Sequence, residues 1–398
     1  MATFSVDFLG CKVSQTDAQE LRERLAAGGH AERRGETDVA VVNTCCVTHE
    51  AVRKSRQAAR RAARHAARVY VTGCGANLAG DALSELPENV TVVRLPSERT
   101  AARVAGDVGA IGCVRADVGL ERVRAFVKVQ DGCSFGCAFC VIPQVRGASR
   151  SRPAAAVLGE IRRRVAQGHR EVVLTGINLG CYRDRDAGLD LPSLIRVAGE
   201  TPGLDRLRLS SIEVNHVSDE LVAAMQETPA VSPHLHVPLQ SGDDGVLASM
   251  RRRYTAAAYL RRVARAAGFN LTTDVIVGFP GEDAAAFERT LRVVERAGVT
   301  KVHVFPYSPR PGTRTAGEDS VPPAVKKERS ARLREASAKA CRRRWREKLG
   351  RDDVVLVDRP GRGYGDDYSP WLVAAPVGEL VRVRAESVGE EGIVGVAA

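Results

Sequence analysis

Three cysteines stand within eight residues near the middle of the chain: Cys133, Cys137 and Cys140, with the spacing C-x3-C-x2-C. A segment this short can turn all three thiols toward one centre without help from distant parts of the fold. Three thiolates are one fewer than the four of an all-cysteine [4Fe–4S] site, so one iron would keep an open position. An open iron suits a cluster that does chemistry better than one that only carries electrons.

Two other interpretations of these cysteines are a zinc site and buried thiols without a metal. Structural zinc sites usually have four protein ligands, often as two C-x2-C pairs. No second pair lies near this segment. Spacings of this kind are typical of metal sites, and we therefore favour the iron–sulfur cluster.

The first 110 residues alternate between short apolar runs, expected to be strands, and helical periodicity. The expected strands are 4–8, 39–43 and 69–72, and the expected helices are 16–27 and 50–68. This alternation predicts parallel βαβ units with right-handed crossovers. Residues 85–122 have weaker patterning and predict the end of this domain and a linker.

A second set of cysteines follows those three expected strands: Cys11, Cys45 and Cys74. The carboxyl ends of parallel strands share one edge of a sheet, so these thiols are expected to meet there as a second three-thiolate site. The alternative is three unrelated small residues near turns. Cys46 would point away from Cys45 in extended backbone and is expected to be structural.

Six further strands are expected between residues 124 and 305, each followed by helical sequence. This periodicity predicts a parallel barrel or an open parallel sheet, and the pattern does not choose between the two. Polar and glycine residues at three of the strand ends could contact a cofactor. The hydroxyls and the carboxylate would suit a ribose, and the backbone of the glycine turn could approach an adenine closely. These residues are Thr175, Gly176, Ser210, Ser211, Glu213, Gly278 and Pro280. Each alone is also ordinary turn chemistry.

The end of the chain changes character after a long charged helix expected at 322–348. Short β-branched runs follow Gly350 and predict a small antiparallel barrel. Tyr368 and Trp371 could stack on nucleic-acid bases there, or could fill the core of the barrel.

The 398-residue chain has a formal charge of +11, which suits a polyanionic partner such as nucleic acid. The helix expected at 51–68 is rich in arginine and could lie against a phosphate backbone or simply face solvent. We find no apolar run of membrane length and no signal-peptide pattern at the start, and therefore expect a cytoplasmic protein without membrane contact. Ten cysteines are then better explained as metal ligands and thiols than as disulfides.

With these parts placed, nearly the whole chain resembles the radical S-adenosylmethionine (SAM) methylthiotransferases. The resemblance rests on the following motifs: Leu9-Gly10-Cys11-Lys12-Val13, Val42-Asn43-Thr44-Cys45, Thr72-Gly73-Cys74, Asp131 to Pro143, Arg146-Gly147 and Ser149-Arg150-Ser151-Arg152. The last fifty residues resemble the TRAM domain, an RNA-binding barrel. Ser14 departs from the family pattern, in which Asn is usual, and the TRAM segment is short.

The resemblance implies an α/β fold of three domains. These are a parallel βαβ methylthiotransferase domain at 1–112, a radical-SAM partial (β/α)6 barrel at 119–348, and a TRAM-like all-β barrel at 349–398. It also implies two [4Fe–4S] clusters, one held by Cys133, Cys137 and Cys140 and one by Cys11, Cys45 and Cys74. SAM would contact Phe139 and the strand-end residues named above.

Three motifs look most like the branch that acts on threonylcarbamoyladenosine in tRNA: Cys11-Lys12-Val13, Asn43-Thr44-Cys45-Cys46-Val47-Thr48 and Lys54-Ser55-Arg56-Gln57. The resemblance then implies that one SAM yields a 5′-deoxyadenosyl radical and a second SAM methylates the sulfur added to C2 of adenosine 37 in the anticodon loop. The expected partners are tRNA and an electron donor such as flavodoxin or ferredoxin, and a monomer is expected. Alternatives are isopentenyladenosine in tRNA, a ribosomal-protein aspartate, or a non-catalytic iron–sulfur protein that binds RNA or transfers electrons.

Overall fold

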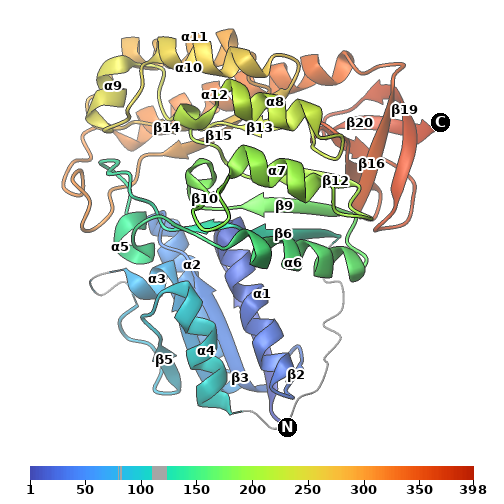
Figure 1. Ribbon diagram of the computed structural model, residues 1–398. Coiled ribbons are helices and arrows are strands. Elements are labelled where there is room, and N and C mark those ends of the chain that lie inside the picture. Colours follow the sequence, from blue (N-terminus) through green and yellow to red (C-terminus); the bar gives the residue numbers. More distant parts are fainter. Residues whose placement is uncertain (79, 81–82, 110–122) are drawn as a thin grey trace. The chain divides into compact units, whose positions relative to one another are not determined.

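The structure is a computed structural model that describes residues 1–78, 80, 83–109 and 123–398 (Figure 1). Its described residues fall into two compact units. One comprises the described parts of 1–121, 131–150 and 308–318, and the other those of 122–130, 151–307 and 319–398. The domain boundary expected between 112 and 119, and Cys113, lie outside the described residues. Within the described part of the chain, no helix is long and apolar enough to cross a membrane.

The first unit contains a five-stranded parallel sheet with the order β2-β1-β3-β4-β5. Its strands are β1 (Thr3–Phe8), β2 (Ala31–Glu32), β3 (Thr37–Thr44), β4 (Ala66–Gly73) and β5 (Val90–Val92). All described pairings are parallel, as the strand–helix alternation predicts. The order places β1, β3 and β4 side by side.

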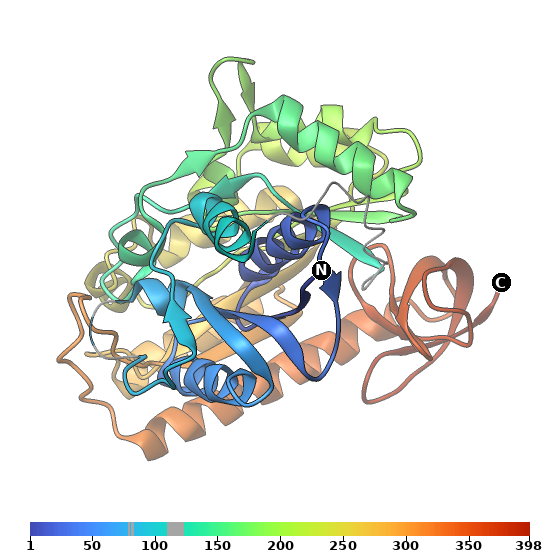
Figure 2. The ribbon, with the colours of Figure 1, turned by 90° about the horizontal axis from the view of Figure 1, so that it is seen from below.

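Helices cover both faces of this sheet. They are α1 (Lys12–Ala27), α2 (His49–Ala62), the short α3 (Cys74–Asn77) and α4 (Ser97–Val108). Val39 and Val41 pack with α1 and α4, whereas the alternate residues Ala40 and Val42 pack with α2. Figure 2 shows α2 on one side of the sheet and α1 and α4 on the other. β5 and α4 lie within residues 85–122, the range expected to hold the end of this domain and a linker, and both belong to the first unit.

The remaining parts of the first unit are the segment 131–150, with α5 (Ile142–Arg146), and the segment 308–318. The backbone N–H of Arg314 donates to the carbonyl of Ala138 at 3.0 Å, and the Gln144 side chain donates to the carbonyl of Gly312 at 2.5 Å. The two segments are therefore held to each other by hydrogen bonds.

The second unit contains six parallel strands. They are β6 (Arg124–Lys128), β9 (Glu171–Thr175), β12 (Arg206–Leu209), β13 (His234–His236), β14 (Asn270–Val277) and β15 (Lys301–Pro306). They form two three-stranded sheets, and parallel bridges from Leu207 to Val231 and from Ser211 to His236 join the sheets. All six strands therefore stand in one row in chain order, and the predicted parallel α/β fold is confirmed.

Helices follow these strands and bury one large apolar core against them. The helices are α6 (Ala154–Ala166), α7 (Leu191–Gly199), α8 (Asp219–Glu227), α9 (Asp244–Ser249), α10 (Ala256–Val263) and α11 (Ala284–Arg296). Short elements connect them: β7 (Gln130–Asp131), β8 (Arg150–Ser151), β10 (Arg183–Asp184), β11 (Leu189–Asp190), η1 (Leu179–Cys181), η2 (Val214–His216) and η3 (Ala264–Ala266). Asp190, Ser218, Thr255 and Asp283 begin α7, α8, α10 and α11 as side-chain caps.

A closed five-stranded barrel ends the chain, after the long helix α12 (Pro323–Arg346). Its strands are β16 (Asp352–Arg359), β17 (Arg362–Tyr364), β18 (Pro370–Leu372), β19 (Leu380–Val388) and β20 (Ile393–Ala397). One pairing, between β18 and β20, is parallel, so the prediction of an antiparallel barrel is wrong there. Trp371 is 1% exposed among Val355, Val383 and Ile393, which makes it a core residue rather than a platform for bases.

The first residues of three strands donate hydrogen bonds to the barrel and fix it to the six-stranded row. Arg206 donates to the carbonyl oxygens of Val354 and Tyr364 at 2.7 and 3.1 Å. Arg124 donates to Asp358 at 3.2 Å, and Asn270 donates to the carbonyl of Asp367 at 2.7 Å. The barrel therefore covers the amino ends of the strands.

Glu171, the first residue of β9, is 1% exposed. Its negative charge balances the arginines beside it. Its carboxylate lies 2.9 Å from Arg208 and 3.3 Å from Arg206. Burial opposes its ionisation, but Arg208, Arg206 and Arg124 outweigh burial, so the pKa of Glu171 is lowered. Arg208 also covers the ring of Tyr368 at 4.9 Å, and Tyr368 stacks on Tyr364 at 4.6 Å, so the barrel's own contacts occupy the Tyr368 ring.

We predict that Glu171→Ala lowers the free energy of unfolding by about 3–5 kcal/mol, because it leaves buried arginines without their counter-ion. The matched control is Glu227→Ala, which removes an exposed pair with Arg196 at 2.8 Å and should cost about 0.2–1 kcal/mol. Urea denaturation followed by circular dichroism measures both. Equal losses in the two variants would contradict the assigned role of Glu171.

Candidate active site

Three cysteines stand at the carboxyl edge of the sheet in the first unit. Cys11 precedes α1 in the loop after β1, Cys45 directly follows β3, and Cys74 directly follows β4 and begins α3. Because β1, β3 and β4 are neighbours, the fold delivers the three residues to one edge of the sheet.

The environment of these thiols suits a soft metal group. Cys45 and Cys74 are each 5% exposed, whereas Cys11 is exposed. Burial raises the pKa of Cys45, and it raises the pKa of Cys74 to about 12. Repulsion from Cys11 adds to both shifts, so the thiols lie close enough to repel each other as thiolates. A bound cationic centre would offset this repulsion, and the donor set therefore fits an iron–sulfur cluster.

Close packing around the cysteines explains the glycines and the asparagine of their motifs. Gly73 has a φ of +85°, and a Cβ added there would lie 1.9 Å from Asn43 Oδ1. Asn43 in turn donates to the backbone carbonyl of Ser14 at 2.8 Å. A Cβ added at Gly10 would lie 3.3 Å from the Cβ of Cys45. Bulkier residues at these glycines would separate the strand ends that carry the thiols.

Cys46 has a different environment from its neighbour Cys45. It is fully buried in an apolar cluster with Leu78, Val141 and Val145. Burial first, and then repulsion from Cys74, raises the pKa of the Cys46 thiol. Its packing agrees with a structural role.

Cys133, Cys137 and Cys140 are half-buried in the loop of the 131–150 segment. The N–H of Cys133 donates to the carbonyl of Gly147 at 3.0 Å, and that of Cys140 to the carbonyl of Cys137 at 3.2 Å. The N–H of Phe135 donates to Cys133 Sγ at 3.4 Å, a contact that stabilises a thiolate. Three partly accessible thiols with a backbone donor fit the predicted cluster, and Phe139 lies half-buried beside Cys140.

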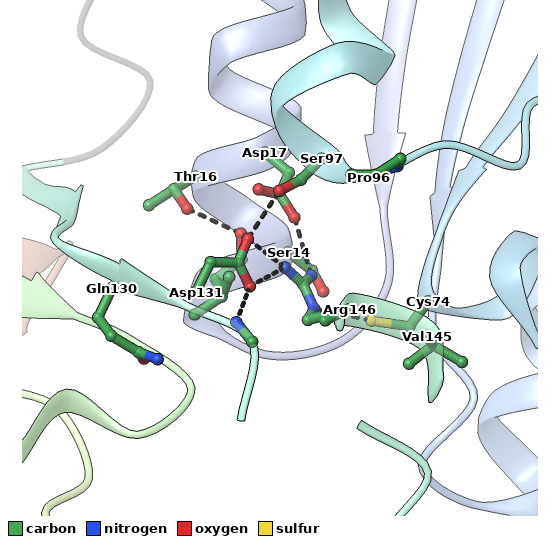
Figure 3. Close-up of polar contacts among 12 residues, drawn as sticks. Ser14, Thr16, Asp17, Cys74, Pro96, Ser97, Gln130, Asp131, Val145 and Arg146 are labelled. Atoms are coloured by element: carbon green, nitrogen blue, oxygen red, sulfur yellow. Dashed lines mark hydrogen bonds and ion pairs between the residues drawn. The ribbon is translucent and has the colours of Figure 1, made fainter. Parts of the chain in front are cut away.

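Arg146, which the sequence offered only as part of a motif, contacts both Cys74 of the cysteine set at the sheet edge and Asp131, which precedes the cysteine loop (Figure 3). It lies in α5 and is almost completely buried. Its Nε donates to Cys74 Sγ at 3.0 Å, and its two terminal nitrogens bind the carboxylates of Asp131 and Asp17. The sequence signal was an arginine six residues after the third cysteine of the loop, but its partners are distant in sequence.

A small hollow adjoins this arginine within the first unit. Asp17, Asn43, Thr72, Cys74 and Ser97 contribute to its wall together with Arg146. Within the described structure, Asn43 Oδ1 and Thr72 Oγ1 are buried and have no hydrogen-bond partner. The hollow beside Cys74 and Arg146 therefore has room for a small polar molecule such as water.

The expected SAM contacts lie in the second unit, after three of its strands. Thr175 ends β9, and Gly176 follows with its N–H 3.4 Å from Ser210 Oγ, just past β12. Ser211 forms the bridge to His236. The structure thus brings Gly176, Ser210 and Ser211 together at the carboxyl ends of neighbouring strands.

Two other expected contacts are already engaged by protein groups. Glu213 forms an ion pair with Arg252, and burial raises its pKa. Gly278 follows β14 with a φ of +72°, its N–H donates to Glu282 at 2.8 Å, and a Cβ there would lie 2.4 Å from Lys326. Pro280 belongs to the same turn. Packing on Lys326 is thus sufficient to explain Gly278, without an adenine.

Polar groups on the last three strands of the row were not among the predicted residues. His236 on β13, Asp274 on β14 and His303 on β15 have ligand atoms within 4.8 Å of one another. His236 donates to or accepts from Thr272 Oγ1 at 2.9 Å and lies 3.2 Å from Asp274. Cys181 Sγ lies 3.4 Å from His216 Nε2 in the connections after β9 and β12. Single polar residues inside apolar strands gave no spacing by which to find these groups.

Two family models match the chain. The Radical SAM superfamily matches residues 127–294, and a family described as Uncharacterized protein family UPF0004 matches residues 3–94. The first match spans most of the six-stranded row, and the second spans most of the parallel sheet that carries Cys11, Cys45 and Cys74.

Relatives match almost end to end. The threonylcarbamoyladenosine tRNA methylthiotransferase MtaB of Thermotoga maritima is 35% identical over 421 residues, covering 99% of this chain and 96% of the relative. The protein of the same name from Chlamydia pneumoniae is 35% identical over 415 residues, covering 99% and 97%. The tRNA-2-methylthio-N(6)-dimethylallyladenosine synthase of Erythrobacter litoralis is 34% identical over 431 residues, covering 99% and 96%.

Solved structures share the fold. The radical S-adenosylmethionine methyltransferase TsrM from Kitasatospora setae superposes with a TM-score of 0.57 at 15% identity, covering 79% of this chain and 77% of TsrM. The cobalamin-dependent S-adenosylmethionine radical enzyme OxsB gives a TM-score of 0.55 at 10% identity, covering 85% of this chain and 57% of OxsB. Fold, cysteine loop and family match together define a radical-SAM enzyme, which implies SAM and a [4Fe–4S] cluster. The near full-length relatives are more specific: the chain belongs to the radical-SAM methylthiotransferase family.

We predict that Gly132→Ala disturbs the cysteine loop. Gly132 has a φ of +69°, and a Cβ there would lie 2.1 Å from the carbonyl oxygen of Ala148, so the backbone beside Cys133 must move. Misplacement by about 1 Å should reduce 5′-deoxyadenosine formation by about 100-fold. Chromatography of the reaction products after anaerobic reconstitution measures it.

The matched control is Gly35→Ala, at a glycine with a φ of +92° and no atom within 4 Å of the added Cβ. It imposes the same backbone strain without the collision and should leave 5′-deoxyadenosine formation unchanged. An equal fall in both variants would show that strain, and not contact with the 147–148 backbone, matters.

Proposed function

We propose that the protein adds a methylthio group to C2 of N6-threonylcarbamoyladenosine at position 37 of tRNA. The second three-thiol set at the sheet edge carries this proposal, because a radical-SAM enzyme that only cleaves SAM needs one cluster. Two relatives named for this substrate match 99% of the chain at 35% identity, which supports the choice of nucleoside.

In this proposal Cys133, Cys137 and Cys140 hold the [4Fe–4S] cluster that binds SAM, and Cys11, Cys45 and Cys74 hold a second [4Fe–4S] cluster. With both bound, the site supplies a 5′-deoxyadenosyl radical, which can activate an aromatic C2–H, and a sulfur that a second SAM methylates. The chain's own residues bind, orient and shield these groups from water.

The strand-end residues of the second unit are assigned to SAM. Gly176, Ser210 and Ser211 offer backbone and hydroxyl groups to its polar parts, and Phe139, Thr175 and the turn at Gly278 and Pro280 contribute contacts. Glu213 takes part only if it is shared with or released from Arg252. The three predicted domains, 1–112, 119–348 and 349–398, then correspond to sulfur insertion, radical generation and RNA binding.

The charge of +11 supports tRNA as the partner. The exposed face of α2 carries Arg53, Lys54, Arg60 and Arg61, although Glu50 pairs with the first two. We assign the protein to the cytoplasm as a monomer that receives electrons from a flavodoxin or ferredoxin.

A second candidate substrate has its own support. A tRNA-2-methylthio-N(6)-dimethylallyladenosine synthase of Alkalilimnicola ehrlichii is 36% identical over 383 residues, covering 89% of this chain and 86% of the relative. Identity alone therefore separates the two nucleosides poorly, and the motifs at 11–13, 43–48 and 54–57 favour threonylcarbamoyladenosine.

The substrate is tested with the reconstituted protein, SAM, dithionite and tRNA purified from a strain that lacks the gene. Mass spectrometry of the digested tRNA should show the methylthio form of threonylcarbamoyladenosine. Methylthiolation of dimethylallyladenosine instead would assign the second candidate, and absence of 5′-deoxyadenosine would exclude radical-SAM catalysis.

The roles of the two cysteine sets are separable by substitution. We predict that Cys133→Ala abolishes 5′-deoxyadenosine formation, because it removes a ligand of the SAM-binding cluster. Cys45→Ala should retain SAM cleavage but stop sulfur insertion. The matched control is the adjacent Cys46→Ala, which should retain both activities. Thiolated tRNA from the Cys45 variant but not from the Cys46 variant would reverse the ligand assignment.

A further inference from the structure

We propose that Arg146 is a positioning residue that donates a hydrogen bond to the Cys74 ligand of the second cluster and thereby sets the reduction potential of that cluster. The inference rests on the proposed function in one respect, namely that Cys11, Cys45 and Cys74 hold a cluster. It goes further in assigning a second set of residues, from other elements, that control how this cluster behaves.

The guanidinium of Arg146 uses each of its three nitrogens for a different partner. Nε donates to Cys74 Sγ at 3.0 Å. Nη1 donates to both carboxylate oxygens of Asp131, at 3.0 and 3.1 Å, and Nη2 donates to Asp17 at 2.8 Å. The side chain is 4% exposed, so these bonds form away from solvent. Figure 3 shows the guanidinium between the two carboxylates and the thiol.

The carboxylates are themselves held in place. Asp131 accepts from Ser97 Oγ at 2.6 Å and from the N–H of Gly132 at 2.7 Å. Asp17 lies on α1, the helix that Cys11 precedes. A planar guanidinium fixed at two corners by carboxylates can direct its third donor only at Cys74. The direction of the N–H···S bond is therefore imposed by the surroundings.

A hydrogen bond to a ligating sulfur stabilises the more negative, reduced form of an iron–sulfur cluster, and so raises its potential. Burial strengthens this effect because water does not screen it. The two carboxylates keep Arg146 charged and raise its pKa, although burial opposes this. The nearby negative charge of Asp17 and Asp131 acts on the potential in the opposite direction.

Arg146 also couples the two cysteine sets through the chain. Asp131 lies two residues before Cys133, and Arg146 lies six residues after Cys140. The segment that carries the SAM-binding cysteines thus provides the donor to a ligand of the sulfur-inserting set. One network of hydrogen bonds therefore links the conformation of this segment to the reduction potential of the second cluster.

The test uses the full chain with Cys133, Cys137 and Cys140 all replaced by Ala, so that only the second cluster is present after anaerobic reconstitution. Arg146→Lys is added to this background. Lysine keeps the charge, but its single nitrogen cannot serve the thiolate and both carboxylates. Redox titration followed by electron paramagnetic resonance should give a more negative potential, by about 59 mV for a tenfold change in a one-electron equilibrium. Iron and sulfide content should stay the same.

Two further variants separate a tuning role from a merely structural one. Arg150→Lys is the matched control: Arg150 lies in the same segment, pairs with Glu98 at 2.7 Å and donates to the backbone carbonyl of Arg146 at 3.0 Å. Its change disturbs this segment but keeps the bond from Arg146 to Cys74, and should leave the potential unchanged. Asp17→Asn removes a negative charge but keeps Arg146, and should move the potential upward, opposite to Arg146→Lys. Damage to the fold would not produce shifts of opposite sign.

The outcomes are distinguishable. If the chain with Cys133, Cys137 and Cys140 replaced by Ala binds no iron, the second cluster does not exist. The Arg146 proposal then fails as well. If the triple-alanine chain binds the cluster, but Arg146→Lys and Arg150→Lys in that chain give the same potential, the Arg146 proposal is overturned. The proposed function then still stands. Should Arg146→Lys not fold, Arg146→Gln takes its place: a potential more negative than in Arg150→Lys supports the tuning role, and an equal potential overturns it.

Discussion

Parallel strands end at one common edge, and this geometric constraint places most of the chemistry in the chain. In the first unit it collects Cys11, Cys45 and Cys74 from segments more than sixty residues apart at the extremes. In the second unit it collects Gly176 and Ser210 from β9 and β12. Few reactive side chains lie on the strands themselves. Their apolar side chains determine where each strand ends and the following connection begins.

Gathering thiols in this way is unfavourable without a compensating partner. Cys45 and Cys74 lose hydration, and their charges repel that of Cys11. The structure contains one strong compensation among the described contacts of Cys74, the Arg146 guanidinium. Its charge is balanced in turn by Asp17 and Asp131, so the cysteine edge depends on a buried network of alternating charges. Such a network stabilises only when every member is satisfied, which ties the geometry of α1, α5 and the cysteine loop together.

Much of this architecture was predictable from the sequence, because long elements repeat with a period of 2 or 3.6 residues. The six strands, α12 and the small barrel follow directly from that pattern. Helix α4 was missed because the residues that it buries, Thr100, Ala101 and Val104, are small and include only one strongly apolar side chain. The parallel pairing of β18 with β20 depends on barrel closure, which no local pattern encodes. Arg146 looked like one basic residue among many, since its partners lie 15, 72 and 129 residues away.

The two ends of the six-stranded row have separate tasks, and the residue types follow that separation. At the amino ends, the first residues of β6, β9, β12 and β14 are polar or charged. Those of β6, β12 and β14 contact the terminal barrel, and Glu171 of β9 pairs with Arg206, one of the residues that do so. At the carboxyl ends stand small residues, Gly176, Ser210 and Ser211. In parallel α/β folds the first kind of position serves stability and the second serves chemistry. The barrel has Trp371 inside its core and Tyr368 packed under Arg208, and its inner contacts hold it to the six-stranded row, so the RNA contact that we propose for it would lie on its outer surface.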